Sequence, residues 1–259
     1  MTRSLTVRRI RPDLSCVPRD WAGDPRTTHM LNGLFAVFPD GEMYFCRSVR
    51  AFADQTTVSA EELRGFYGQE SNHGAAHREA FVMLERQGYH IEDWLEWYRG
   101  FAYGRREKRL SPQLRLAVTA ALEHLTASLA DIAFDPDDII ADVHPSMREL
   151  TQWHAAEEIE HRAVAYDVLQ QVHPSWVLRV CGMWLALVAL MRFGMSAMNH
   201  LAKQDGTRGT RRHFLRNVFG RRKVLQQVIA YCKPGFHPDN AGPHVVAEAY
   251  LAELDRRVA

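Results

Sequence analysis

Cysteine is scarce in this chain, and its four cysteines stand far apart with no Cys-x-x-Cys pair. The spacing argues against a zinc knuckle or a dense disulfide framework, and a reducing cytosol fits best. A membrane-spanning run is also missing, because the most apolar stretch, 180–191, is about a dozen residues long and a span needs roughly 20. We expect a cytoplasmic protein in which this stretch is a core helix. A helix that lies at a membrane interface or lines an apolar substrate entrance is the alternative.

An excess of charge of one sign is absent as well, since 32 Lys and Arg face 31 Asp and Glu. No global field favours a polyanion, so nucleic acid is not an expected partner. No Gly-x-Gly-x-x-Gly follows a strand and no P-loop occurs, so we expect no nucleotide or flavin bound within the chain. Any reducing equivalents would have to come from an external electron donor.

Segments with helical periodicity, separated by turn signals, make up most of the sequence and predict an all-α protein. Only 5–10 has the pattern of a short strand. A capping box from Ser59 to Glu62 opens the best-defined helix, and Asp135-Pro-Asp-Asp138 marks a further helix start. The helices are expected at 28–52 with a break at Pro39-Asp-Gly41, and at 59–88, 91–105, 112–132, 145–173, 174–203, 210–232 and 243–259. We divide the chain into an N-terminal arm (1–26), a helical bundle (27–173) and a C-terminal helical extension packed on the bundle (174–259).

Two Glu-x-x-His pairs are the most informative motif. Glu70 and His73 are three residues apart on one predicted helix, and Glu158 and His161 repeat that spacing on another. Residues at this spacing project from the same helical face, so each pair could hold one metal ion. The alternative is a solvated face on which the two side chains hydrogen-bond to each other.

A single carboxylate stands on each of two further helices. Glu123 shares an apolar stripe with Leu116 and Ala120, which turns it inward, whereas Glu42 could instead serve the dipole of a helix first turn. The order Glu, Glu-x-x-His, Glu, Glu-x-x-His is the ligand pattern of ferritin-like di-iron and di-manganese carboxylate bundles. The sequence thus predicts a ferritin-like four-helix bundle with a dinuclear metal site, plus additional C-terminal helices. Two iron ions are the expected cofactor, with manganese as the alternative.

Three neighbouring residues extend this pattern. His154 precedes Glu158 by four residues and adds an imidazole to the same helical face. Glu157 competes with Glu158 as a ligand, or holds an imidazole N–H from outside the metal shell. His77, one turn beyond His73, could be an extra ligand, a proton relay or an ordinary core histidine.

The combined set resembles the ligands of the di-iron arylamine N-oxygenases, in which an extra histidine on the last bundle helix joins the two Glu-x-x-His motifs. That resemblance covers the motifs and not the whole chain. It implies bridging of the two metals by carboxylates from two of the helices, without saying which two. The seven ligands that it implies are Glu42, Glu70, His73, Glu123, His154, Glu158 and His161.

Longer pieces of the sequence carry a second resemblance. They are Leu5-Thr-Val-Arg-Arg-Ile10, Phe38-Pro-Asp-Gly-Glu42 running to Arg47-Ser-Val-Arg50, Gln69-Glu-Ser-Asn-His73 with His77, Trp153-His-Ala-Ala-Glu-Glu-Ile-Glu-His161, and Pro234-Gly-Phe-His-Pro238. In these pieces the chain resembles a bacterial family described as predicted metal-dependent hydrolases, itself of ferritin-like character. Since the family name is a predicted activity, the resemblance implies fold and metal more firmly than it implies hydrolysis.

Three functions follow from these patterns. We expect first a non-haem di-iron oxidase or oxygenase that activates O2 on a hydrophobic or aromatic small molecule, with electrons from an external donor. The alternative is a dinuclear metal-dependent hydrolase in which His77 or Glu157 moves a proton. The third hypothesis is a non-catalytic metal-binding helical protein. A homodimer and peripheral membrane contact through 176–201 stay open.

Overall fold

The computed structural model describes residues 4–135, 142–242 and 244–258, and every regular element in these ranges is helical. The all-α prediction is confirmed at this level. Two π-helical segments, Arg99–Arg106 and Leu215–Phe219, extend α4 and α9. The α-helices are α1 (Pro25–Phe35), α2 (Phe38–Arg50), α3 (Ala60–Arg86), α4 (Glu92–Tyr98), α5 (Pro112–Ala130), α6 (Pro145–His161), α7 (Val164–Val172), α8 (Trp176–Asp205), α9 (Thr210–Phe214), α10 (Arg222–Tyr231) and α11 (Val245–Val258).

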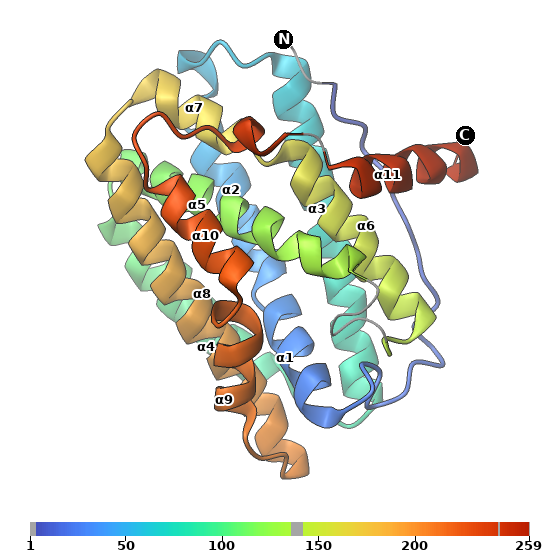
Figure 1. Ribbon diagram of the computed structural model, residues 1–259. Coiled ribbons are helices and arrows are strands. Elements are labelled where there is room, and N and C mark those ends of the chain that lie inside the picture. Colours follow the sequence, from blue (N-terminus) through green and yellow to red (C-terminus); the bar gives the residue numbers. More distant parts are fainter. Residues whose placement is uncertain (1–3, 136–141, 243, 259) are drawn as a thin grey trace.

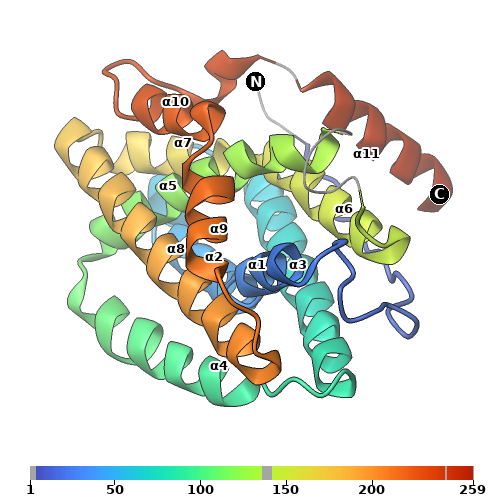
Figure 2. The same cartoon turned by 60° about the horizontal axis from the view of Figure 1, so that its bottom comes forward.

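Four of these helices enclose a common interior. Helix α2 packs against α3 and α5, and α6 packs against the same two helices. Helix α7 adds contacts with α2, α3 and α5, while α8 lies along α1 and α5, and α11 lies on α6 (Figures 1 and 2). The faces of α2, α3, α5 and α6 that carry the predicted ligands therefore look toward one another.

Local capping signals set two helix starts where the sequence places them. The Ser59 hydroxyl accepts a hydrogen bond from the Glu62 backbone N–H (3.1 Å), and α3 begins at the next residue. Ser111 accepts from the Leu114 N–H (3.2 Å) at the start of α5. The break before α2 differs from expectation, since it lies at residues 36–37 and Pro39 falls inside the first turn. Proline is tolerated there because the first helical N–H groups have no intrahelical acceptor to lose.

The segment 5–10 is not a strand, contrary to the sequence pattern; residues 4–14 have no regular structure. The segment lies on α3 instead. The side-chain amide of Gln69 donates to the Thr6 carbonyl (2.9 Å), and that of Asn72 donates to the Arg8 carbonyl (2.9 Å). Gly65 permits the close approach, since a Cβ there would lie 2.8 Å from the carbonyl oxygen of Leu5. Helix side chains thus satisfy backbone groups that a neighbouring strand would otherwise bind.

Two helices that the sequence predicts as continuous are each divided. Helix α6 ends at His161 and α7 begins at Val164, while the π-helical extension of α9 ends at Phe219 and α10 begins at Arg222. Gly220 marks the second break, as expected for a weak helix former. The first break has neither glycine nor proline, so the sequence pattern gives no sign of it. The helix start expected at 135–138 lies outside the described residues from position 136 onward.

The apolar stretch 180–191 forms part of α8 and is only partly a core helix. Its inner face is buried against α1 and α5, whereas Trp184 and Val188 are 63% and 52% exposed. By length and composition, Pro112–Phe134 and Trp176–Asp205 could each cross a membrane; most of the first apolar window is buried in the fold, but only a third of the second. Length and composition by themselves are weak grounds for membrane contact.

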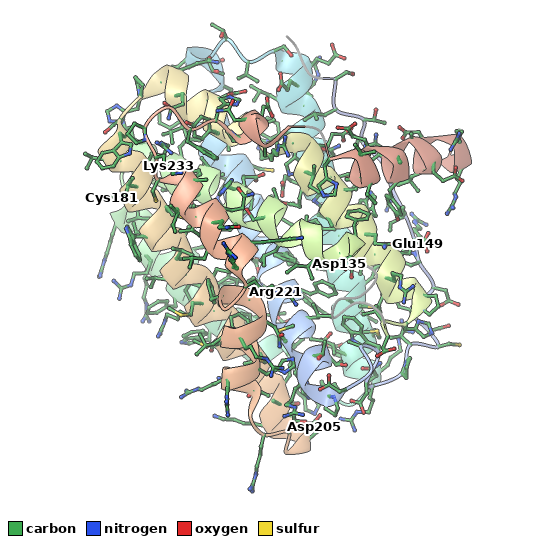
Figure 3. The ribbon with its side chains drawn as sticks, viewed as in Figure 1. Asp135, Glu149, Cys181, Asp205, Arg221 and Lys233 are labelled. Atoms are coloured by element: carbon green, nitrogen blue, oxygen red, sulfur yellow. The ribbon has the colours of Figure 1, made fainter. Side chains whose placement is uncertain are left out.

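The far end of α8 is fastened to the rest of the fold by Asp205, which Figure 3 labels. Its Oδ2 lies 2.7 Å from His29 Nε2 of α1 and accepts from the Tyr89 hydroxyl at 2.7 Å. Cys181 stands on the exposed side of the same helix (Figure 3), and all four cysteines are free. Hydrogen bonds rather than disulfides therefore tie α8 to its neighbours.

Close packing between α5 and α8 depends on Gly182. A Cβ at this position would lie 2.5 Å from the Ala117 carbonyl oxygen, which is backbone and cannot rotate away. We expect Gly182→Ala to lower the free energy of unfolding by about 2 kcal/mol, as overpacking does. Gly100→Ala is the control, because outside its own helical turn no described atom lies within 4 Å of its Cβ position. Urea denaturation at equal metal content measures both; equal midpoints for Gly182→Ala and the parent would contradict the expectation.

Candidate metal centre

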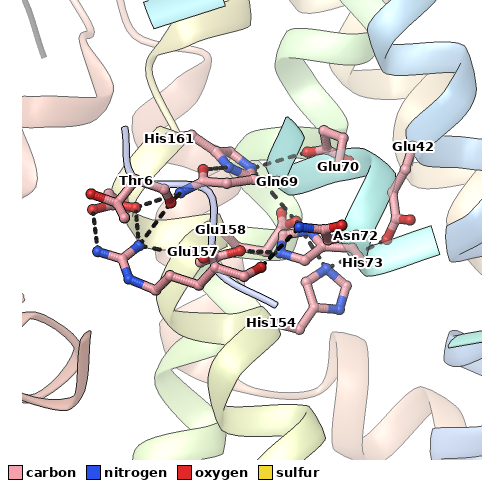
Figure 4. Close-up of polar contacts among 12 residues, drawn as sticks. Thr6, Glu42, Gln69, Glu70, Asn72, His73, His154, Glu157, Glu158 and His161 are labelled. Carbon is pink, nitrogen blue, oxygen red and sulfur yellow. Dashed lines mark hydrogen bonds and ion pairs between the residues drawn. The ribbon is translucent and has the colours of Figure 1, made fainter. Parts of the chain in front are cut away.

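The side chains singled out in the sequence meet between four helices, and Figure 4 labels most of them. None is more than 5% exposed. The i, i+3 and i, i+4 spacings put each helix's contribution on one inward face. The residues are Glu42 from α2; Glu70, His73 and His77 from α3; Glu123 from α5; and His154, Glu157, Glu158 and His161 from α6. The structure brings all nine together; their roles as ligands or catalytic groups stay predictions.

One group of donors surrounds the imidazole of His161. Its Nε2 lies 3.1 Å from Glu70 Oε1, 3.2 Å from Glu123 Oε2 and 3.6 Å from Glu158 Oε1. One atom each from Glu70, Glu123 and His161 lies within 4.8 Å of the others. Three helices, α3, α5 and α6, thus supply two carboxylates and one imidazole to a single point.

A second group lies beside the first. His154 Nε2 is 2.9 Å from Glu158 Oε1 and 3.6 Å from Glu42 Oε1, and His73 Nδ1 is 3.6 Å from Glu158 Oε1. His73, His154 and Glu158 fall within one 4.8 Å set, and so do Glu42, Glu70 and His73. The second point therefore receives two imidazoles and carboxylates from α2, α3 and α6.

Glu70 and Glu158 are shared between the two points. Glu70 belongs to a donor set with His161 and also to one with Glu42 and His73. Glu158 Oε1 faces the imidazoles of both groups at the distances given above. The sequence could not choose which carboxylates bridge, and this placement selects Glu70 of α3 and Glu158 of α6 as the candidates.

In His73, His161 and His154, the ring nitrogen that points away from the cluster has a partner at hydrogen-bond distance. His73 Nε2 lies 2.9 Å from Glu157 Oε2, and His161 Nδ1 lies 2.9 Å from the side-chain oxygen of Gln69. In both cases an oxygen at the outer nitrogen can hold the ring proton there, so the inner nitrogen could offer its lone pair to a bound metal. His154 Nδ1 lies 2.7 Å from His77 Nε2. Glu157 thus lies behind His73, and Gln69 plays a positioning part that the sequence reasoning missed. His77 also falls within a 4.8 Å donor set with Glu42 and His154, so it stays a candidate for an extra ligand as well as for a proton relay.

Arg8 of the N-terminal segment is a second residue that the sequence reasoning missed. It is 5% exposed and pairs with Glu157 (Nη1 to Oε1, 3.3 Å), Glu160 (Nη1 to Oε2, 2.8 Å) and Asp255 of α11 (Nε to Oδ1, 2.6 Å). Gln69 also donates to Glu160 Oε2 at 2.6 Å. A chain of contacts from Arg8 through Glu157 therefore reaches His73. No local spacing could reveal it, because Arg8 and Glu157 are 149 positions apart.

The cluster contains a concentration of unpaired polar atoms, which is the test of whether a metal fits. Both carboxylate oxygens of Glu42, Glu70 and Glu123 are buried without a well-aligned hydrogen bond among the described residues, as are Glu158 Oε2 and His73 Nδ1. The close neighbour of Glu70 and Glu123 is His161 Nε2, which itself has no aligned hydrogen bond among the described residues. Buried polar groups are rarely left unpaired, since each costs free energy. Carboxylate oxygens and imidazole nitrogens converging on two points form a donor set for two divalent cations. The residues present therefore fit a dinuclear metal centre.

The pKa values of the buried carboxyl groups also fit a site for cations. Burial, followed by repulsion from Glu123, raises the pKa of Glu70 to about 8, and burial raises the pKa of Glu123 to about 7. Burial and the charge of Glu70 raise the pKa of Glu42 well above its usual range. Burial opposes ionisation of Glu158 too, but hydrogen bonds from His154 and His161 hold its pKa well below the usual range. Without cations, most of these carboxyl groups resist ionisation.

A small cavity of about 100 Å³ touches this cluster. His154 and Glu158 line it together with Phe35, Phe38 and Thr126. The Phe38 ring centroid lies 4.9 Å from that of His154 and 5.1 Å from that of His77. The approach to the predicted metal ligands is therefore narrow and largely apolar.

The comparisons with known proteins give one match. A family model described as "Predicted metal-dependent hydrolase" matches residues 6–242, a range that includes all nine residues of the cluster as well as Arg8 and Gln69. No curated protein and no solved structure matches the chain.

Proposed function

The chain belongs to the family of predicted metal-dependent hydrolases, and from this premise we propose that it is a hydrolase with two metal ions in the Glu/His cluster. The family resemblance expected from the sequence is confirmed. One observation carries the proposal: seven carboxylate and imidazole side chains from four helices converge on two adjacent points, and most of their inner oxygen and nitrogen atoms are buried without a hydrogen bond among the described residues. We also propose that α2, α3, α5 and α6 form a ferritin-like bundle, since their donors follow the ligand order of that class.

The proposed ligands are Glu42, Glu70, His73, Glu123, His154, Glu158 and His161. Bound divalent cations would polarise a carbonyl or phosphoryl oxygen and lower the pKa of a water molecule. Iron, manganese and zinc are the candidate ions for this set of carboxylate and imidazole donors.

The protein's own groups divide the remaining work. Glu157 is a positioning residue rather than a catalytic one, because both of its oxygens face outward partners, His73 Nε2 and Arg8. His77 is the better candidate to move a proton: it contacts His154 and also packs against Phe35, which lines the small cavity. The aromatic rings of Phe35 and Phe38 exclude water from the approach to the cluster.

Metal loading and ester hydrolysis together test the proposal. The purified protein is expected to hold two metal equivalents per chain by elemental analysis, and chelation followed by reloading with Zn²⁺, Mn²⁺ or Fe²⁺ should abolish and restore hydrolysis of 4-nitrophenyl esters. Glu123→Gln should lose both metal and activity, whereas Glu79→Gln on the exposed face of α3 should keep both. Hydrolysis that persists without metal would sink the proposal.

An oxidase or oxygenase is the second candidate, although no comparison supports it. It is favoured by the donor set itself, because four carboxylates with imidazoles on a four-helix frame suit iron redox chemistry. Anaerobic loading with Fe²⁺ and exposure to O2 separates the two candidates. Stoichiometric O2 uptake without ester hydrolysis selects the oxygenase, which then needs an external electron donor. If the metal-loaded protein neither consumes O2 nor hydrolyses esters, the non-catalytic metal-binding protein is the remaining hypothesis.

A further inference from the structure

A second, larger cavity lies between α2, α5, α8 and the segment from α4 through the π-helix. Its volume is about 730 Å³, within the range of pockets for small organic ligands. Phe45, Val118, Leu122 and Phe193 are among the apolar side chains that line it. Nothing in the proposed metal chemistry uses this space.

The cavity adjoins the metal cluster through two shared residues. Phe38 and Thr126 line both the large cavity and the small cavity at His154 and Glu158. Gly41, which precedes the predicted ligand Glu42, also lines the large cavity, and a Cβ there would meet only the Tyr103 hydroxyl, at 3.8 Å. A ligand in the large cavity would therefore end one aromatic ring away from the cluster.

The solvent-exposed part of the cavity lining is positively charged. Arg106, Arg109 and Arg192 line the cavity and are exposed. The guanidinium carbons of Arg106 and Arg192 each lie 5.1 Å from the centroid of the Phe101 ring. The two arginines thus converge on one ring, and neither forms an ion pair with a carboxylate in the described part of the chain.

The polar groups within the cavity are already occupied. Glu107, the acidic side chain among the described residues that line the cavity, pairs with Arg47 (Nη2 to Oε2, 2.9 Å) and lies 3.5 Å from Arg115. The hydroxyls of Tyr98 and Tyr103 are hydrogen-bonded to each other at 2.6 Å. The interior accordingly offers an apolar surface, and the unpaired charge at its mouth is cationic.

We propose that this cavity binds an amphiphile with an apolar chain and an anionic head, such as a long-chain carboxylate. The head lies between Arg106 and Arg192, where guanidinium groups bind carboxylate or phosphate oxygens well, and the chain extends toward Phe38. The part of the molecule remote from its anionic head reaches the metal cluster. That the amphiphile is the substrate rests on the proposed function, whereas its binding in this cavity does not.

The mouth of the cavity gives the ligand a route from an apolar phase. Leu185 and Val188 of α8 line the cavity and are also exposed on the outer face of that helix. An apolar chain moving along this face therefore stays in contact with apolar side chains until it enters. Ligand entry would explain why apolar side chains are exposed on this face of α8, which core packing does not explain.

Calorimetric titration of the metal-loaded protein with monomeric dodecanoate tests the proposal. We expect saturable binding of one dodecanoate per chain, at least tenfold tighter than hexanoate, which has too short a chain, and than dodecyltrimethylammonium, which has the same chain and the opposite charge. These comparisons need no variant. Equal affinity for dodecanoate and dodecyltrimethylammonium, or absence of dodecanoate binding, would overturn the proposal.

Two variants locate the ligand. Arg106→Gln combined with Arg192→Gln should weaken dodecanoate binding at least tenfold without weakening dodecyltrimethylammonium. Gly41→Leu should weaken both by filling the inner end of the cavity, while Gly100→Ala, on the same π-helical segment as Phe101 but facing open space, should change neither. Unchanged dodecanoate affinity in both test variants would place the ligand elsewhere and refute the assignment.

Binding and hydrolysis can fail separately. A protein that binds dodecanoate through these arginines but hydrolyses no ester keeps the amphiphile site and loses the proposed hydrolase. One that cleaves 4-nitrophenyl acetate in a metal-dependent way but binds no dodecanoate keeps the hydrolase and loses the site.

Discussion

Glu70→Gln is expected to make the metal-free protein more stable and the metal-loaded protein less stable. Burial and the neighbouring Glu123 raise the pKa of Glu70 to about 8, far above that of an unfolded chain, near 4.3. Between these values the folded state holds a proton that the unfolded state has lost, so the stability of the metal-free protein falls as pH rises. Glutamine cannot ionise and escapes that loss. The melting temperature of metal-free Glu70→Gln should therefore exceed that of the parent at pH 9, with a gap that shrinks toward pH 5.

Metal reverses the order of the two proteins. A ligand present at a thousandfold excess over its Kd stabilises a folded chain by about 4 kcal/mol, and the parent should gain this on loading. Glu70→Gln removes a carboxylate shared by both donor groups, so its melting temperature should barely respond to metal. Glu79→Gln on the same helix is the control and should behave as the parent. If Glu70→Gln binds two metal equivalents and melts with the loaded parent, Glu70 is not a ligand.

Arg8→Met is expected to produce the largest loss of stability among single changes outside the metal ligands. Arg8 is buried against Glu157, Glu160 and Asp255. Removing one partner of a buried ion pair costs about 3 kcal/mol or more. Here the buried Glu157 loses its cation, whereas Glu160 and Asp255 keep contact with solvent. Metal affinity should fall about tenfold as well, since the carboxylate that orients His73 loses its own support. Urea denaturation and competitive metal titration measure the two effects.

A double substitution tests whether the stability lost in Arg8→Met comes from the unpaired charge of Glu157. In Arg8→Met combined with Glu157→Gln the buried position no longer carries a charge, so part of the stability lost in Arg8→Met should return. The neighbouring Arg9 is exposed, and Arg9→Met should leave stability and metal affinity unchanged. Equal losses for Arg8→Met and Arg9→Met would show that the ion-pair network contributes nothing.

Much of the candidate site could be predicted because its signals are local. The i, i+3 spacing of Glu70 with His73, and of Glu158 with His161, fixes which side chains share a helical face whatever the rest of the chain does. Capping at Ser59 and Ser111 is equally local, and both helix starts agree with the structure. The structure also gathers Glu42 and Glu123 into the cluster, as the order of donors along the chain predicts.

The predictions of secondary structure failed where residues far apart in the sequence form hydrogen bonds with each other. The pattern at 5–10 reads as a strand, but side chains of α3 bind its carbonyls. The division between α6 and α7 has no local breaker, and Arg162 at that point donates to the carbonyl of Gly242 (2.8 Å). Such contacts override propensity, which is a weak prior when tertiary partners are available.

The sequence alone determined the helical class, the family resemblance and the identity of the predicted ligands, because periodicity and short spacings fix what lies on one face of one helix. Only the tertiary structure decided which carboxylates are shared between the two donor groups and which residues contact the outer nitrogens of the imidazoles. It also decided where Arg8 and the large cavity lie relative to the cluster. These features depend on the packing of segments far apart in the chain, and the free energy of that packing is not encoded in any short window of residues.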